Sequence, residues 1–102
     1  MNRRVFVVQD SPGKNLLPAR SFGDIRIMLT HRDLTQGYVH VQQRLMQSLE
    51  DFDETKDYLL LIGDPIAMGL AIHMVLSDCG SVKLLKWIRE KYDYAVEEVY
   101  DE

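Results

Sequence analysis

The stretch Tyr58-Leu59-Leu60-Leu61-Ile62-Gly63-Asp64-Pro65 decides the fold. Its first five residues are continuously apolar, which is typical of a central strand that is buried on both faces. Gly63 permits a sharp exit from the strand, Asp64 is a preferred N-cap residue, and Pro65 has the fixed φ that suits the first position of a helix. The stretch therefore predicts a strand that passes directly into a helix.

The residues that follow extend this unit to a second strand and a hairpin. Ile66 to Leu76 is apolar around nearly its whole circumference and predicts the helix, which the turn residues 77–80 close. Ser81 to Ile88 predicts the next strand, so the unit is a right-handed crossover between two parallel strands. Tyr92 to Tyr100 predicts a last strand, antiparallel to the one before it.

The N-terminal half predicts two strands and one amphipathic helix. Val5 to Val8 is β-branched and aromatic and predicts the first strand, and Ile25 to Leu29 predicts the second. The segment from Lys14 to Gly23 is expected to be an extended loop between them. Apolar residues at spacings of three and four then predict a helix that covers one side of the sheet. These residues are Tyr38, Val41, Leu45, Leu49 and Phe52.

We therefore expect one α/β domain over residues 1–102. A small mixed sheet of four to five strands packs with two helices, in the order β-β-α-β-α-β-β. A chain of 102 residues has the ordinary size of one domain, and no linker is long enough to separate two. The acidic segment from Asp51 to Asp57 is expected to be a solvated linker inside this domain.

Composition excludes several classes of protein. The single cysteine, Cys79, cannot form an intramolecular disulfide and excludes a multi-cysteine zinc site, so a reducing, cytoplasmic compartment is expected. The apolar run from Val5 to Val8 is too short for a signal peptide, and the longest apolar stretch, Pro65 to Leu76, is too short to span a bilayer. We therefore expect no membrane partner.

Charge is divided unevenly along the chain. Residues 1–44 hold seven basic and three acidic side chains, whereas residues 45–102 hold five basic and thirteen acidic ones. A surface with two signs favours complementary contacts, head to tail or with a partner, over a uniform nucleic-acid-binding face. Scattered solvating charge is the simpler interpretation.

The junction at Gly63 and Asp64 is the first candidate ligand-binding site. Ligands sit at the carboxyl ends of parallel strands in open α/β sheets, and helix N-termini attract anions. Asp64, however, places a carboxylate where a phosphate would bind, and no Walker or dinucleotide fingerprint is present. A plain N-cap is the simpler interpretation.

Basic and aromatic residues interleave on the predicted hairpin, which is the second candidate site. Single-stranded nucleic acid stacks its bases on aromatic faces and places its phosphates on cations. The acidic residues within 93–102 would weaken such binding by repulsion, and a tryptophan packed on the core is the simpler interpretation. The candidate residues are Lys83, Lys86, Trp87, Arg89 and Tyr92.

The apolar helix predicts self-association. A helix on one face of so small a sheet normally keeps a polar outer stripe, and Ile66 to Leu76 has almost none. The other helix or a second copy could cover it, and we expect a homo-oligomer because exposed apolar side chains are costly. The expected interface residues are Met68, Ile72, His73, Met74 and Val75.

Neither a catalytic nor a metal site is predicted. No serine has the context of a nucleophile elbow, and Cys79 has no histidine or basic neighbour in sequence that would lower its pKa. His31, His40 and His73 lie at no recognised ligand spacing. We therefore expect no metal ion and no cofactor, and enzymatic activity has no support in the sequence.

Three segments resemble small proteins of unknown function that tailed bacteriophages encode. These segments run from Val7 to Ala19, from Leu59 to Ala67 and from Val82 to Trp87. They carry no catalytic signature. The resemblance implies a phage origin and a location in the host-cell cytoplasm, and by analogy an accessory factor that binds a host or phage macromolecule.

These observations predict a noncatalytic accessory interaction protein that acts through protein–protein contacts and self-association, with a host or phage protein as its partner. The alternative is a small nucleic-acid- or nucleotide-binding protein that uses the Gly63-Asp64-Pro65 junction or the Trp87 hairpin. Binding of single-stranded DNA that weakens as salt is added would favour the alternative.

Overall fold

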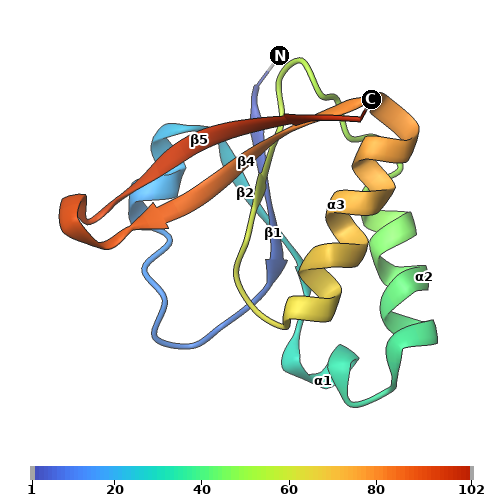
Figure 1. Ribbon diagram of the computed structural model, residues 1–102. Helices are drawn as coiled ribbons and strands as arrows, with labels where there is room; N and C mark the ends of the chain where they lie inside the picture. The colour runs from blue at the N-terminus through green and yellow to red at the C-terminus, as the bar shows by residue number, and fades with distance from the viewer. Residues whose placement is uncertain (1, 102) are drawn as a thin grey trace.

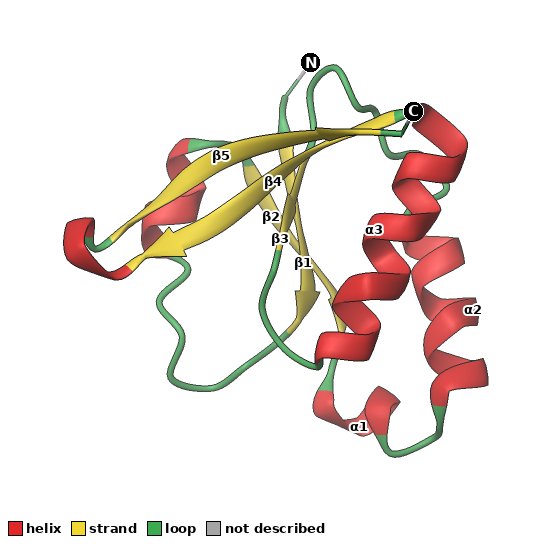
Figure 2. Ribbon diagram, viewed as in Figure 1, coloured by secondary structure: helices red, strands yellow, loops and turns green. Residues whose placement is uncertain are grey.

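The structure is a computed structural model that describes residues 2–101. It is an α/β fold on a five-stranded mixed sheet, as the sequence predicts (Figures 1 and 2). The strands are β1 (Arg4–Gln9), β2 (Asp24–Leu29), β3 (Tyr58–Leu60), β4 (Ser81–Ile88) and β5 (Asp93–Tyr100). The helices are α1 (His31–Leu34), α2 (Tyr38–Ser48) and α3 (Pro65–Cys79), with 3₁₀ turns η1 (Leu17–Ser21) and η2 (Arg89–Lys91).

The strand order in the sheet is β2-β1-β3-β4-β5. β1 pairs in parallel with β2 and with β3, β3 pairs in parallel with β4, and β4 pairs antiparallel with β5. The predicted parallel pair joined by a helix is confirmed, because Leu59 lies opposite Leu84 in a parallel ladder. The predicted hairpin is also confirmed, with Ser81 opposite Tyr100 and Ile88 opposite Asp93.

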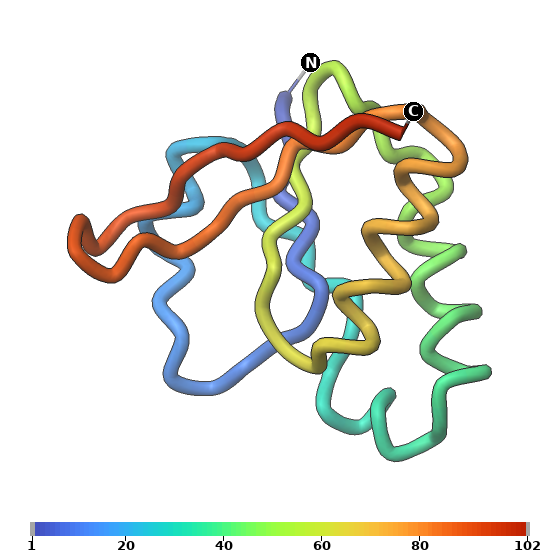
Figure 3. Tube along the Cα trace, viewed as in Figure 1, coloured from blue at the N-terminus to red at the C-terminus, as the bar shows by residue number. Residues whose placement is uncertain are grey.

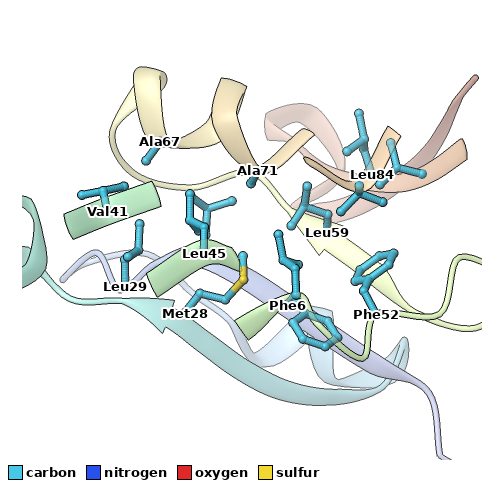
Figure 4. Packing of buried hydrophobic residues seen from close by; sticks show 14 residues of the cluster. Phe6, Met28, Leu29, Val41, Leu45, Phe52, Leu59, Ala67, Ala71 and Leu84 are labelled. Carbon is cyan, nitrogen blue, oxygen red and sulfur yellow. The ribbon is translucent and has the colours of Figure 1, made fainter. Parts of the chain in front are cut away.

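Two hydrophobic cores cover the two faces of the sheet. α2 and α3 lie side by side over one face (Figures 1 and 3), and Figure 4 shows the apolar side chains that they bury against the strands. η1 and the loop before it cover the other face, where Leu16 and Ala19 pack on a smaller cluster. β3 lies between both cores and all three of its residues are buried, as its continuous apolar sequence predicts.

α3 begins and ends at residues suited to those positions. Asp64 is the N-cap residue, and its carboxylate accepts a hydrogen bond of 3.0 Å from the backbone N–H of Ala67. Gly80 ends the helix with a φ of 83°, a left-handed conformation that glycine adopts without steric cost. No helix within residues 2–101 has the length and apolar character that crossing a membrane requires.

The connecting segments differ from the expectation in several places. β3 ends at Leu60, two residues before the expected end of the strand, and α3 continues through residues 77–79, which were expected to form a turn. The segment from Lys14 to Gly23 is not wholly extended, because Pro18 lies at the start of the 3₁₀ turn η1. The helix expected to reach Phe52 ends at Ser48, and the chain then turns so that Phe52 still packs in the core. The additional short helix α1 precedes α2, where the hydroxyl of Thr30 caps it.

The expectation that residues 51–57 are a solvated linker is wrong, because Asp57 is completely buried. Its Oδ1 accepts hydrogen bonds from the backbone N–H (3.1 Å) and Nε (3.3 Å) of Arg4. Its Oδ2 accepts from Nη2 of Arg4 (2.7 Å) and from the backbone N–H of Asp53 (2.9 Å). A buried carboxylate needs such partners because an unpaired charge is costly to remove from water.

Candidate functional site

The chain reverses its direction of travel across the sheet between β1 and β3. The connection from β1 to β2 contains η1, which covers one face, whereas the connections from β2 to β3 and from β3 to β4 contain α2 and α3, which cover the other. The loops that follow β1 and β3 therefore leave the sheet toward opposite faces. Such a topological switch point opens a crevice in which doubly wound folds bind their ligands.

A pocket of about 770 Å³ lies at this position, and we name it the switch-point pocket. Its lining comes from the carboxyl ends of β1, β3 and β4, from the loop after β1, from α1, from β5 and from the first turn of α3. Its volume is that of a small-molecule site. The lining residues are Gln9, Ser11, Gly13, Lys14, Asn15, His31, Leu34, Leu61, Ile62, Gly63, Asp64, Met68, Trp87 and Tyr94.

Gln9 and Gly63 hold the two central strands together beside the pocket. Oε1 of Gln9 accepts a hydrogen bond of 2.8 Å from the backbone N–H of Asp64. Gly63 has a φ of 115°, and a Cβ at this position would overlap with the Gln9 side chain. The Asp64 carboxylate also accepts a hydrogen bond of 3.2 Å from the Tyr38 hydroxyl, and partial desolvation together with this bond raises the pKa of Tyr38. Asp64 is therefore committed to the helix cap and to Tyr38.

Aromatic rings form one wall of the pocket. The rings of Trp87 and Tyr94, which lie opposite each other on β4 and β5, meet edge to face with centroids 5.0 Å apart. The Tyr94 hydroxyl donates a hydrogen bond of 3.0 Å to the carbonyl of Asn15, and burial raises the pKa of Tyr94. This bond ties the hairpin to the loop after β1. The ring of Tyr92 also meets Trp87 edge to face, with its centroid 6.4 Å away.

The loop after β1 supplies a cation and an open stretch of backbone. Lys14 is exposed, and its backbone N–H donates a hydrogen bond of 3.2 Å to the carbonyl of Ser11. The turn requires Gly13 at a φ of 88°, and no atom lies within 4 Å of where a Cβ would project, so the loop backbone is open to close approach. His31 lines the same pocket. Within residues 2–101, no three histidine, cysteine, aspartate or glutamate side chains are grouped so that they could hold a metal ion.

The structure brings residues of two separate sequence predictions to one place. Gly63 and Asp64, predicted as a ligand site, and Trp87, predicted as a nucleic-acid site, all line the switch-point pocket. Lys83 lies elsewhere, since its Nζ donates a hydrogen bond of 3.0 Å to the carbonyl of Thr55. The other predicted nucleic-acid residues are exposed on the hairpin outside the lining. They are Lys86, Arg89 and Tyr92.

The residues predicted at an interface of α3 fall into three environments. Val75 is 2% exposed and belongs to the core of the single chain, so it lies at no surface. His73 is exposed. Ile66, which was not among the predicted interface residues, is 53% exposed, whereas α2 packs against other parts of α3. The remaining three are half-buried against the same core, and they are Met68, Ile72 and Met74.

Sequence reasoning missed the part of the site that precedes β2. In the sequence, Ser11 belongs to the turn that ends the first strand, and Lys14 and Asn15 begin the segment that is expected to be an extended loop. They join Asp64 because β1 lies beside β3, a neighbour relation that no local pattern encodes. The signal for this site would have been a pair of adjacent parallel strands whose following connections cover opposite faces of the sheet. The loops after both strands line the crevice between them.

Comparison with known proteins shows the family to which the chain is similar. Residues 3–100 match the model of a family described as phage Pam3 gp32-like protein, which confirms the predicted resemblance to small phage-encoded proteins. No curated protein and no solved structure matches the chain. The matched segment includes every residue that lines the switch-point pocket. Because the match spans nearly the whole chain, the protein belongs to the phage Pam3 gp32-like protein family.

Proposed function

We propose that this phage protein is a noncatalytic accessory factor that acts by binding, and that the switch-point pocket takes a nucleotide, either free or at the end of a single strand. One observation supports the proposal above all. An aromatic wall and a lysine-bearing loop converge on a pocket of about 770 Å³ at the topological switch point, where doubly wound folds bind ligands.

The aromatic wall suits a nucleobase. Trp87 is 37% exposed, so its ring offers area to a ligand while the edge contact with Tyr94 holds it in place. Stacking of a base on such a ring contributes about 1–3 kcal/mol and tolerates any base. The apolar side chains of Leu34, Leu61 and Met68 also line the pocket and favour the burial of a flat, weakly polar group.

The loop after β1 suits the phosphate. In doubly wound folds the turn after the first strand approaches the phosphates of a nucleotide, and here that turn carries Lys14 and the open backbone at Gly13. The N-terminus of α3 does not serve this purpose, because the Asp64 carboxylate occupies it as the cap. We therefore place the phosphate on the Lys14 side and the base against Trp87.

The test uses Trp87 as its own reporter, since it is the single tryptophan of the chain. Adenosine monophosphate, thymidine monophosphate and a short oligothymidylate are titrated into the protein while tryptophan emission is recorded. The proposal expects a saturable change with a dissociation constant below about 1 mM, which corresponds to more than about 4 kcal/mol of binding free energy. Tighter binding of the oligonucleotide, with a steep loss on adding salt, would identify a single strand as the ligand.

Two exposed lysines provide a matched pair of variants. Lys14→Ala removes the cation of the pocket and should weaken binding about five- to tenfold, whereas Lys91→Ala removes a cation of the hairpin turn outside the pocket and should leave it unchanged. Isothermal calorimetry on Trp87→Ala checks the aromatic wall without relying on fluorescence. The proposal is overturned if no probe gives saturation, or if Lys91→Ala weakens binding as much as Lys14→Ala.

A further inference from the structure

We infer that the two outer strands of the sheet, β2 and β5, are complementary surfaces through which copies of this chain join head to tail. β5 is eight residues long and, within residues 2–101, no strand pairs with its outer side, and β2 is the opposite edge. Open strand edges carry unpaired backbone donors and acceptors that recruit another strand.

Both edges also expose apolar side chains. On β5, Val96 is 42% and Val99 38% exposed, and on β2, Ile27 is 46% exposed. Large apolar side chains gathered on a long edge strand are unusual in a chain that stays single, because they favour pairing with another strand. The apolar residues therefore indicate contact, and the charges around them select the partner.

The charges of the two edges differ. β5 and the residue after it carry four exposed carboxylates and no basic side chain, whereas β2 carries the exposed carboxylate of Asp24 and the exposed guanidinium of Arg26, which lies 3.7 Å from the Asp51 carboxylate. The exposed Arg20 lines a hollow beside β2 together with Asp24. The division follows the uneven charge of the two halves of the chain, since β2 belongs to the basic half and β5 to the acidic half. The four carboxylates belong to Asp93, Glu97, Glu98 and Asp101.

The faces of the two edges match as well. Arg26 lies over the ring of Phe6, on the face that α2 and α3 cover, and Glu97 lies opposite Leu84, whose side chain packs on that same face. If β5 of one copy extends the sheet beyond β2 of the next, Arg26 and Glu97 share one face. Opposite charges across neighbouring strands stabilise a sheet.

The other face brings together the apolar pair. Ile27 lies beside Val7 and Val96 lies opposite Leu85, and both Val7 and Leu85 belong to the cluster under η1. Ile27 and Val96 therefore share this second face when the sheet is extended. The continued sheet keeps the helices of both copies on one side, with β5 antiparallel to β2 as it is to β4.

A symmetric contact between two β5 strands is unfavourable. Pairing β5 with a second β5 would bring the carboxylates of Glu97 and Glu98 against their own copies, and like charges directly opposite destabilise a sheet. A head-to-tail contact places unlike edges together at every junction. A head-to-tail assembly leaves a free edge at each end, so further copies can join it. The assembly stops growing only if the rotation between neighbouring copies closes a ring.

The experiment is sedimentation equilibrium on the full chain from about 1 μM to about 1 mM, a range in which weak contacts saturate. The wild type should rise above the 11.9 kDa monomer mass as concentration increases. Glu97→Arg and Arg26→Glu should each return the mass toward the monomer, while Arg32→Glu, an exposed charge on α1, should leave association unchanged. Far-ultraviolet circular dichroism verifies that each variant is folded.

A mixture of the Glu97→Arg and Arg26→Glu variants tests directly whether the two edges pair with each other. Each edge of the Glu97→Arg copy is then complementary to an edge of the Arg26→Glu copy, so an equimolar mixture should associate again although neither variant does so alone. Constant monomer mass for the wild type at all concentrations overturns the inference. So does association that both variants leave intact, or a mixture that stays monomeric. None of these outcomes depends on the switch-point pocket or on a nucleotide.

Discussion

Oε1 of Gln9 accepts a hydrogen bond of 2.8 Å from the backbone N–H of Asp64 and so joins the carboxyl ends of two neighbouring parallel strands. The side chain of Gln9 occupies the space in which any residue other than glycine at position 63 would place its Cβ. One contact thus sets the exit of the chain from β3, the start of α3 and the edge of the switch-point pocket.

Gly63→Ala should therefore be more damaging than other glycine substitutions at positive φ. Alanine would adopt a φ of 115° with strain and would also overlap with Gln9, so we expect a loss of about 2–3 kcal/mol in the free energy of unfolding. Gly37→Ala is the control, since its φ is 93° with open space around it, and it should lose about 1 kcal/mol. Urea denaturation measures both, and equal losses would contradict the proposed role of the Gln9 contact.

The buried ion pair predicts a large difference between two neighbouring aspartates. Asp57→Ala leaves the guanidinium of Arg4 without its buried partner and should lower the free energy of unfolding by about 3–5 kcal/mol. Asp51→Ala removes a carboxylate that also binds Arg4, at 2.7 Å, but whose side chain is 62% exposed, so the loss should be about 0–1 kcal/mol. Thermal and urea denaturation would refute this account if the two variants were equally stable.

Stability in acid should depend on Asp33. The carboxylate of Asp33 accepts a hydrogen bond from Nε2 of His40 and another from the backbone N–H of Thr30. These bonds, the first more than the second, lower the pKa of Asp33 below its ordinary value of 3.8. Because the pKa is lower in the folded state, the stabilisation is complete above pH 3.8 and is lost as pH falls through the lower, folded value. Asp33→Asn should flatten the dependence of the melting temperature on pH below about pH 4. Asp78→Asn, an exposed carboxylate on α3, should preserve the dependence.

Cys79 should react slowly with thiol reagents in the folded protein. Desolvation, followed by the neighbouring Glu54, raises the pKa of this thiol from 9.0 to about 11, so about a hundredfold less thiolate is present at pH 8. Its rate of alkylation by iodoacetamide should therefore rise by about that factor when urea unfolds the chain. Equal rates in the two states would show that the thiol is freely accessible and unperturbed.

The predictable part of the fold is the part whose signals are local. The run from Tyr58 to Ile62, the cap at Asp64 and the proline after it predict a buried strand and a helix start. In the structure the strand starts at Tyr58 but ends at Leu60, two residues before the expected end, and the helix starts at Pro65 as predicted. The extension of α2 to Phe52 was not correct, because an apolar side chain can reach the core from a turn as well as from a helix. Asp57 was misjudged for a related reason, since an aspartate in an acidic run has the same appearance whether water or an arginine binds it.

The candidate site was predicted in pieces. The Gly63 and Asp64 junction and Trp87 were separate candidates, and they line one pocket because Trp87 lies at the carboxyl end of β4, which is parallel to β3 and beside it. The prediction of a homo-oligomer rested on the apolar surface of α3, and it too lacked information about which elements lie beside that surface. Whether a helix that is apolar all round exposes that surface depends on what lies beside it, and α2 covers much of it.

By itself the sequence determined the strand that begins at Tyr58, the helix from Pro65 to Leu76, the next strand and its hairpin, and the class of the fold, because apolar periodicity, caps and turns act over a few residues. Only the tertiary structure decided that β1 lies between β2 and β3, that Arg4 meets Asp57 and that Lys14 and Trp87 share a pocket. The contacts involved join residues that are far apart in the sequence. Arg4 and Asp57 are 53 positions apart, and Gln9 and Asp64 are 55 positions apart. These contacts follow from the order of strands in the sheet, and that order is settled by packing among all the elements together, which no short stretch of sequence records.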